Sequence, residues 1–305
     1  MISRRFLNRR TLKAGAVSLF ALVVAWLLLS CSAAWLMTRR AHAPFAEPPP
    51  SVTGTICEQV RLDTSDGQQL GAWFVQGKED GPSVIVLHGH RGCRRDMIGL
   101  AGMLNAAGYS VLAVSLRAHG DSTGGYDDVG YSARHDVVAA VAYLEQRRLG
   151  RPIFIQGTSM GAAAAIYAAG ELGNQVSGYI LECPYRDIRS AVRNRTNAYL
   201  PWPLNATAYA GLNLVGPFFL PEIDRMAPID RIEEMPATIP VLLMAGGSDT
   251  RARPEEVEAI YQRVASHAKF IVFPDVPHCQ FFGTCGAAYD HAVLRFFSRA
   301  IPAHD

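Results

Sequence analysis

The chain has 305 residues and a formal net charge of +2, and hydrophobic residues make up 49% of it against 18% charged residues. This balance excludes an intrinsically disordered chain, and the length suffices for a large domain with a buried core. Residues 1–46 hold seven basic residues and no acidic one, which leaves 22 basic and 27 acidic residues elsewhere. Because that remainder is mildly acidic, the composition gives no support to nucleic-acid binding.

The first 43 residues (1–43) have the features of a membrane anchor or an export signal. Between Ala14 and Met37 the chain has 24 residues without a formal charge. A helix of that length extends about 36 Å, which is enough to cross a hydrocarbon core of about 30 Å. More basic residues precede this stretch than follow it, so the positive-inside rule keeps the N-terminus cytoplasmic. We therefore predict a membrane-anchored protein whose main domain is extracytoplasmic, either periplasmic or extracellular.

Two other fates of this segment are compatible with its sequence. Residues 41–43 have the small-x-small form of a cleaved signal, whereas residues 28–31 resemble a lipobox whose Cys31 would be acylated. Residues 8–13 also loosely resemble a twin-arginine signal. The uncharged stretch is longer than the 7–15 apolar residues of an ordinary signal, which favours a retained anchor.

Residues 44–51, with three consecutive prolines, are predicted to be a stiff extended spacer, and residues 52–302 a single α/β domain. In that domain short apolar runs alternate with helical stretches. The predicted strands are 55–62, 70–76, 83–87, 109–114, 153–155, 178–181, 240–244 and 269–273, and the predicted helices are 97–107, 131–148, 160–169, 254–264 and 287–300. Near-continuous apolar strands separated by helices indicate a mostly parallel sheet with helices on both faces, and the first two strands would form an antiparallel hairpin at one edge.

Residues 186–236 interrupt the alternation and are rich in aromatic residues and proline. Irregular loops longer than about 15 residues are uncommon, so we expect a small cap over the C-terminal ends of the strands. Its aromatic side chains would either line an apolar acyl or aromatic pocket or form the core of the cap itself. These residues are Tyr199, Trp202, Tyr209, Phe218 and Phe219.

A G-x-S-x-G motif at residues 157–161 places Ser159 between a predicted strand and a predicted helix. A sharp turn in this position holds the serine hydroxyl clear of the sheet, and the flanking glycines let strand and helix approach closely. The backbone N–H of Met160, at the helix start, would face an oxyanion formed at the hydroxyl. Ser159 is therefore the candidate nucleophile.

Two further residues follow the last predicted strands. Asp249 comes after strand 240–244 and His278 after strand 269–273. The order serine, aspartate, histidine is the one this architecture requires, and all three residues would lie at one edge of the sheet. Glu182, at the end of the strand before the cap, is an alternative acid, but its position favours it less than Asp249.

The glycine-rich turn after strand 83–87 supplies a candidate second oxyanion donor. We expect the backbone N–H of His90 to point at the same oxyanion as that of Met160. Because the donor is a backbone group, the side chain of His90 need not be essential. The neighbouring His88 is expected to be a structural, buried imidazole.

Taken together, the run 88–92, the motif 157–161, Asp249 and His278 resemble the α/β-hydrolases. The nearest likeness is to the serine aminopeptidase and acylglycerol-lipase-like hydrolases, including their membrane-anchored bacterial members, and it covers roughly residues 55–300. This resemblance implies an α/β-hydrolase fold, a Ser-His-Asp triad and acyl-enzyme chemistry without a cofactor or metal.

One departure from that subgroup is visible. Its D-x-R-G-H-G-x-S run reads S-L-R-A-H-G-D-S at residues 115–122. We expect this run to shape a loop, with Arg117 and His119 in structural roles. The departure therefore bears on the subgroup and leaves the triad untouched.

The sequence thus predicts a serine hydrolase that cleaves small carboxylic esters or related acyl compounds, lipid-like ones included. An amidase or aminopeptidase with the same triad is an alternative, and it would need an acidic recess for a substrate amine. Candidates for that recess are Glu182, Asp187, Glu222 and Asp224. A non-catalytic binding protein that kept the fold is a third hypothesis. Among six cysteines, Cys279 and Cys285 are close enough in sequence to close a small disulfide loop.

Overall fold

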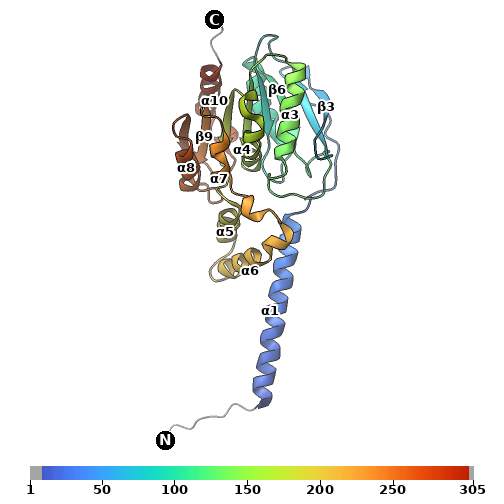
Figure 1. Cartoon of the computed structure of the whole chain (residues 1–305), viewed down its shortest axis with the longest axis vertical. Coiled ribbons are helices and arrows are strands. Elements are labelled where there is room, and N and C mark those ends of the chain that lie inside the picture. Colours follow the sequence, from blue (N-terminus) through green and yellow to red (C-terminus); the bar gives the residue numbers. More distant parts are fainter. Residues whose placement is uncertain (1–8, 302–305) are drawn as a thin grey trace.

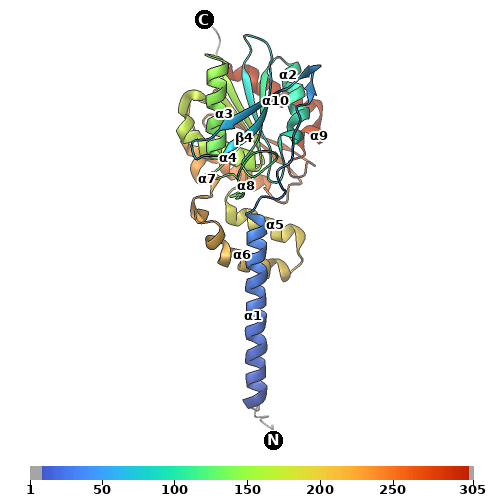
Figure 2. The same ribbon diagram turned by 90° about the vertical axis from the view of Figure 1, so that its right-hand side faces the viewer.

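The computed structural model describes residues 9–301. It consists of a globular body from which one long helix, α1 (Arg9–Met37), extends (Figures 1 and 2). The first basic residues predicted to stay cytoplasmic, Arg4 and Arg5, and residue 302 at the predicted end of the domain lie outside the described residues.

Helix α1 is long and apolar enough to cross a membrane. Its candidate span, Leu12–Met37, has 26 residues, and an 18-residue window within it reaches a mean hydropathy of 2.3. Only 6% of that window is buried inside the protein. An apolar helix so exposed differs from the core helix of a globular domain, and it fits either a membrane span or a signal segment.

The body is built around one eight-stranded sheet, with the strand order β10-β9-β8-β7-β5-β6-β4-β3. The strands from β10 to β6 in this order pair in parallel, whereas β3 and β4 form an antiparallel hairpin at one edge. In chain order the strands are β3 (Glu58–Asp63), β4 (Gln69–Val75), β5 (Ser83–Leu87), β6 (Ser110–Ser115), β7 (Ile153–Thr158), β8 (Gly178–Glu182), β9 (Val241–Gly246) and β10 (Ala268–Phe273). The predicted mostly parallel sheet with an edge hairpin is confirmed. A separate two-stranded sheet pairs β1 (Ser51–Val52) with β2 (Thr55–Ile56).

Helices cover both faces of the large sheet (Figures 1 and 2). They are α2 (Ile98–Ala106), α3 (Arg134–Arg147), α4 (Met160–Leu172), α8 (Pro254–Arg263), α9 (Phe281–Cys285) and α10 (Ala287–Ala300), with the 3-10 turns η1 (Arg94–Met97) and η2 (Gly173–Gln175). The alanine-rich α4 has almost every side chain buried. Its small residues let it sit close to β7, which fixes the start of the helix at the sheet edge.

Residues between β8 and β9 form a helical insertion at the end of the body from which α1 extends (Figure 1). It contains α5 (Ile188–Tyr199), α6 (Leu204–Phe219), η3 (Ile223–Arg225), α7 (Pro228–Arg231) and η4 (Ile232–Glu234). Helix α6 packs against α1, and the indole N–H of Trp26 donates to the Thr207 carbonyl at 3.1 Å. The insertion thus contacts both the body and the long helix.

The proline-rich segment ahead of β1 is bound to the body through Glu47, a feature the prediction of a stiff spacer did not include. The Glu47 carboxylate lies 3.1 Å from Arg94 Nη1, and both side chains are fully buried. Glu47 also accepts from the Ser115 hydroxyl, and its carbonyl accepts from the Trp73 indole. Because a buried charge is stable only when it is paired, this contact fixes the path from α1 into the domain.

Candidate active site

Ser159 occupies the sharp turn between β7 and α4. Its backbone φ is 52°, in the left-handed region that costs a non-glycine residue about 1–3 kcal/mol. A Cβ added to Gly161 would lie 2.6 Å from the Leu87 carbonyl oxygen, and one added to Gly157 would meet the backbone of Gly161 at 2.5 Å. Glycine is therefore needed on both sides for the strand and helix to approach as closely as they do.

The structure brings Ser159, His278 and Asp249 together. Ser159 Oγ lies 3.0 Å from His278 Nε2, and His278 Nδ1 lies 2.7 Å from Asp249 Oδ2. Asp249 is only 3% exposed, and its other carboxylate oxygen accepts from the backbone N–H groups of Arg251 and Ala252. These bonds hold the carboxylate in one orientation, so it in turn orients the imidazole.

Glu182, the alternative acid, lies elsewhere in the site. Its buried carboxylate accepts hydrogen bonds from Gln156, Thr158 and Tyr289. Burial raises the pKa of Glu182, although these three bonds oppose the shift. Within the described residues Glu182 makes no hydrogen bond to His278, so Asp249 is the carboxylate paired with the imidazole.

Met160 and His90, the residues of the two predicted oxyanion donors, both lie near the serine. Met160 begins α4, so its backbone N–H is one of the first-turn groups that no carbonyl of the helix accepts. His90 lines the same pocket as Ser159, and a Cβ added to Gly89 would lie 3.7 Å from Ser159 Cβ. The turn after β5 therefore runs directly beside the serine.

Two buried imidazoles support this turn. His88 Nε2 accepts from the Leu116 N–H at 3.0 Å, and burial lowers the pKa of His88 to about 3. His119 Nε2 accepts from the Arg91 N–H at 3.1 Å, and burial also lowers its pKa. Both rings are therefore neutral hydrogen-bonding groups, as expected for structural histidines. Arg117 is likewise held by Asp136 and Asp66, in the structural role predicted for it.

Sequence reasoning missed Asp127, which lies beside these rings. Its carboxylate lies 3.0 Å from His90 Nδ1 and 3.5 Å from His119 Nε2, and the three ligand atoms fall within 4.8 Å of one another. Two histidines and an aspartate are residue types that can hold a metal ion. However, His119 Nε2 already accepts a hydrogen bond from the Arg91 N–H, so its lone pair is not available to a metal ion.

A pair of cysteines lies next to the imidazole. Cys183 Sγ and Cys279 Sγ are 3.3 Å apart, and both residues have positive φ. All six cysteines are free thiols. The sulfur that lies beside Cys279 Sγ is that of Cys183, and not that of Cys285, the disulfide partner considered from sequence. Hydrogen bonding to Cys183 and His278 lowers the pKa of Cys279 to about 6.

The serine opens into a pocket with a volume of about 320 Å³. Met97, Leu100 and Phe282 form an apolar side, while Arg195 and Arg251 bring positive charge to it. A smaller, mainly apolar cavity between α1, α5 and α6 shares His90 and Arg195 with this pocket. The two cavities are therefore neighbours.

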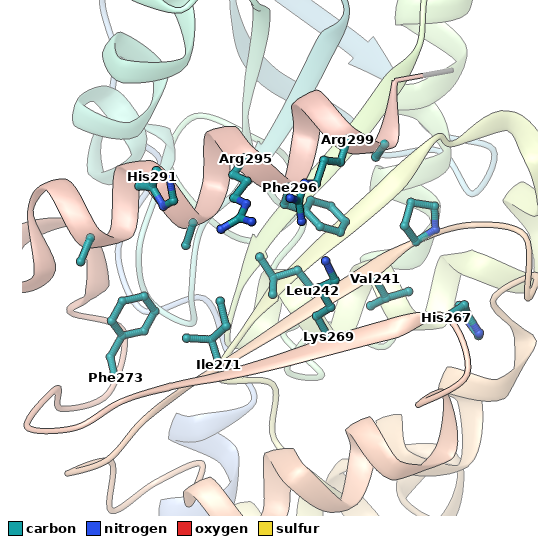
Figure 3. A pocket seen from close by; sticks show the side chains of 14 residues that line it. Val241, Leu242, His267, Lys269, Ile271, Phe273, His291, Arg295, Phe296 and Arg299 are labelled. Carbon is teal, nitrogen blue, oxygen red and sulfur yellow. The ribbon is translucent and has the colours of Figure 1, made fainter. Parts of the chain in front are cut away.

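A larger groove of about 500 Å³ lies between β10 and α10 at the edge of the sheet (Figure 3). Lys269, Arg295 and Arg299 are among the residues that line it, and the three triad candidates are not. This groove is therefore distinct from the pocket that opens at Ser159.

Comparisons with known proteins bear on the fold and on the class of the protein. Residues 79–217 match the family model described as serine aminopeptidase S33. An uncharacterized protein of Mycobacterium tuberculosis is 28% identical over 86% of this chain and 86% of its own. A thermostable monoacylglycerol lipase of a Bacillus species is 36% identical over 30% of this chain and 36% of its own.

A solved esterase from Pyrococcus furiosus is 26% identical and superposes with a TM-score of 0.64, over 83% of this chain and 99% of the esterase. Nearly the whole of that esterase is therefore matched by the globular body. The predicted fold is confirmed, and the chain belongs to the α/β-hydrolase superfamily.

Proposed function

We propose that this hydrolase cleaves carboxylic esters through a covalent acyl-enzyme formed on Ser159. The observation that carries the proposal is the continuous chain of contacts from Ser159 Oγ through His278 to the buried Asp249. A nucleophile, a base within hydrogen-bond reach and a third group that orients the base are the elements this chemistry requires.

In the proposed mechanism His278 Nε2 accepts the Ser159 proton as Oγ attacks the ester carbonyl. The backbone N–H groups of Met160 and His90 stabilise the oxyanion of the tetrahedral intermediate. Its collapse breaks the ester bond, and the protonated His278 gives its proton to the leaving alcohol. Water, deprotonated by the same imidazole, then attacks the acyl-enzyme, and the protonated imidazole returns the proton to Ser159 Oγ as the acid is released. Asp249 holds the imidazole and stabilises its cation throughout, and no step uses a cofactor or a metal.

The charges around the pocket favour esters over substrates with a free amine. An aminopeptidase needs a free carboxylate for that amine, yet the four acidic candidates are engaged elsewhere. Glu182 accepts three hydrogen bonds, Asp187 caps α5 through the Ser190 N–H, and Asp224 and Glu222 pair with Arg189 and Arg225. Arginines line the pocket instead.

Membrane attachment through α1 completes the proposal. The apolar cavity beside the pocket is lined by Ala34 and Met37, at the C-terminal end of α1, as well as by the insertion. Lipid-like acyl esters would reach such a cavity from the membrane surface. We propose an extracytoplasmic body, because more basic residues precede the span than follow it.

The test uses the full-length chain with p-nitrophenyl esters of increasing acyl length and with aminoacyl p-nitroanilides. The proposal predicts ester hydrolysis that is lost in Ser159→Ala, with little cleavage of the anilides. Preferential anilide cleavage would support the aminopeptidase, and equal turnover by wild type and Ser159→Ala would refute the mechanism.

A further inference from the structure

Arg195 is a half-buried arginine without a partner among the described residues. It projects from α5 toward the junction of the two cavities and lines both of them. Within residues 9–301 it makes no ion pair and no hydrogen bond. A half-buried guanidinium that is partly desolvated and has no protein partner keeps all of its N–H donors available to an anion.

Arg251 adds a second positive charge to the same pocket. Its backbone N–H donates to Asp249, and its guanidinium contacts the Tyr199 hydroxyl. In the described part of the chain no carboxylate lies within 4.0 Å of this guanidinium. Burial, and then the neighbouring charges of Arg251 and Arg91, lower the pKa of Arg195.

The acidic residues of the pocket do not supply that anion. Asp96 accepts from the Cys93 N–H, and the Glu182 carboxylate is enclosed by its three donors. We propose that Arg195 and Arg251 form a subsite for a negatively charged group of the substrate, a carboxylate or a phosphate next to the scissile ester. This inference rests on the proposed esterase activity and specifies its substrate class.

The experiment compares ester pairs that differ only in charge. For a charge on the acyl side the pair is p-nitrophenyl hydrogen glutarate and p-nitrophenyl pentanoate. For a charge on the alcohol side it is butyroylglycerol phosphate and monobutyrin. The ratio of kcat/KM within each pair is measured for wild type, Arg195→Gln and Arg251→Gln. Arg193→Gln is the matched control, since Arg193 lies on the same helix but is exposed and lines neither cavity.

The proposal predicts that wild type prefers the anionic member of at least one pair. Each glutamine variant should lower that preference about tenfold or more, which is the usual weight of a hydrogen bond to a charged group. Arg195→Lys should restore part of it, and Arg193→Gln should leave it unchanged. If the ratio of kcat/KM for the anionic and the neutral ester is the same in wild type and in both glutamine variants, the subsite is overturned. Hydrolysis of the neutral esters that depends on Ser159 would in that case still support the proposed esterase activity.

A second, independent observation concerns α6. The chain has no charged residue between Arg195 and Glu222, so the whole of α6 and both of its flanks are uncharged. Several large apolar side chains of this region face solvent. They are Trp202, Leu204, Leu214 and Phe218, with Trp202 and Phe218 more than four-fifths exposed. An exposed apolar patch of this kind marks an interaction surface.

The position of α6 against α1 identifies the partner. Ser30 and Ala34 are buried on one side of α1, and a Cβ added to Gly211 of α6 would meet Ser30 Oγ at 2.1 Å. Small residues that let two helices approach closely are typical of helix pairs within membranes. Figures 1 and 2 both show α6 beside the C-terminal half of α1.

The contact lies well inside the candidate span. Trp26 bonds to Thr207 of α6 and stands 11 residues before Met37, the end of the span, which corresponds to about 16 Å along the helix. Because α6 contacts α1 at this depth, a bilayer crossed by α1 must also surround part of α6. We infer that α6 is seated in the extracytoplasmic leaflet, with its exposed apolar face against lipid, so that the insertion opens the active site toward the membrane.

The test reconstitutes the full chain in phosphatidylcholine vesicles that contain a photoreactive diazirine phosphatidylcholine. Peptide mapping should find lipid adducts in α1 and in residues 200–220, and none around Leu149, an exposed leucine of the body. Gly211→Leu, which separates α6 from α1, should reduce labelling of residues 200–220 severalfold, whereas Gly102→Leu, where an added Cβ meets nothing within 4 Å, should not. Adducts confined to α1 would overturn the inference, whatever the outcome of the esterase assays.

Discussion

His278 Nδ1 lies 2.7 Å from Asp249 Oδ2, and this contact distinguishes between the two carboxylates that the sequence offered. Asp249→Asn is expected to keep the geometry but to favour the wrong imidazole tautomer, lowering kcat by about 10⁴-fold. Glu182→Gln should change kcat less than tenfold, because Glu182 makes no hydrogen bond to the imidazole. It should instead lower the melting temperature, since the new amide would oppose the donors of Gln156 and Thr158. A larger loss of kcat in Glu182→Gln than in Asp249→Asn would reverse the assignment.

The pH dependence of the reaction should reflect the surroundings of His278. Burial alone would lower the pKa of this imidazole, but hydrogen bonds to Asp249 and Cys279 outweigh it and raise the pKa to about 9. Only the neutral imidazole accepts the Ser159 proton, so kcat/KM should rise with pH until about 9. Cys279→Ser removes one of the stabilising partners of the cation and should move the midpoint to lower pH.

The same shift has a consequence for stability. A raised folded-state pKa of His278 stabilises the fold below the ordinary histidine pKa of about 6.5, and this contribution disappears as the pH rises through about 9.

The pH profile of kcat/KM, measured with a neutral ester, tests this account of His278. An identical midpoint of that profile near 6.5 in wild type and Cys279→Ser would contradict it.

Thiol chemistry should single out Cys279. Its pKa is lowered to about 6 and it lines the pocket, whereas burial raises the pKa of Cys57, Cys93 and Cys285. Iodoacetamide at pH 7 should therefore modify Cys279 first, and the adduct should inactivate the enzyme by filling space beside His278. Peptide mapping during inactivation measures this. Cys279→Ser should resist inactivation, and loss of activity at the same rate in that variant would place the sensitive thiol elsewhere.

The buried pair of Glu47 and Arg94 should contribute strongly to stability. Glu47→Ala removes one partner of the Arg94 guanidinium, which keeps its two contacts with Asp121, so the expected cost is that of lost charged hydrogen bonds, about 1.5–3 kcal/mol of unfolding free energy. Glu145→Ala, at an exposed position of α3, is the control and should change it by less than about 0.5 kcal/mol. Denaturant unfolding of the full chain gives both values, and equal effects would show that the segment before β1 is not held by this contact.

The sheet and the positions of the three triad candidates could be predicted because their signals are local. Each strand is a short apolar run, and Ser159, Asp249 and His278 each follow the end of a strand. The carboxyl ends of parallel strands meet at one edge, so the topology alone brings the three residues near one another. Their catalytic roles remain predictions until they are measured.

Contacts between distant segments could not be predicted in this way. The pairing of Glu47 with Arg94, of Cys183 with Cys279 and of α6 with α1 depends on how loops and helices pack, and no local pattern encodes it. One signal was nevertheless present in the sequence. The absence of charge between Arg195 and Glu222 is unusual for an exposed cap and could have indicated a surface that meets lipid.

The most direct test of the central claim is the site of reaction with a fluorophosphonate probe. The full-length protein is incubated with the probe, and the modified residue is identified by mass spectrometry of its peptides. The account predicts a single adduct on Ser159 that is absent in Ser159→Ala and strongly slowed in His278→Ala. An adduct on another residue, or equal labelling of wild type and Ser159→Ala, would contradict it.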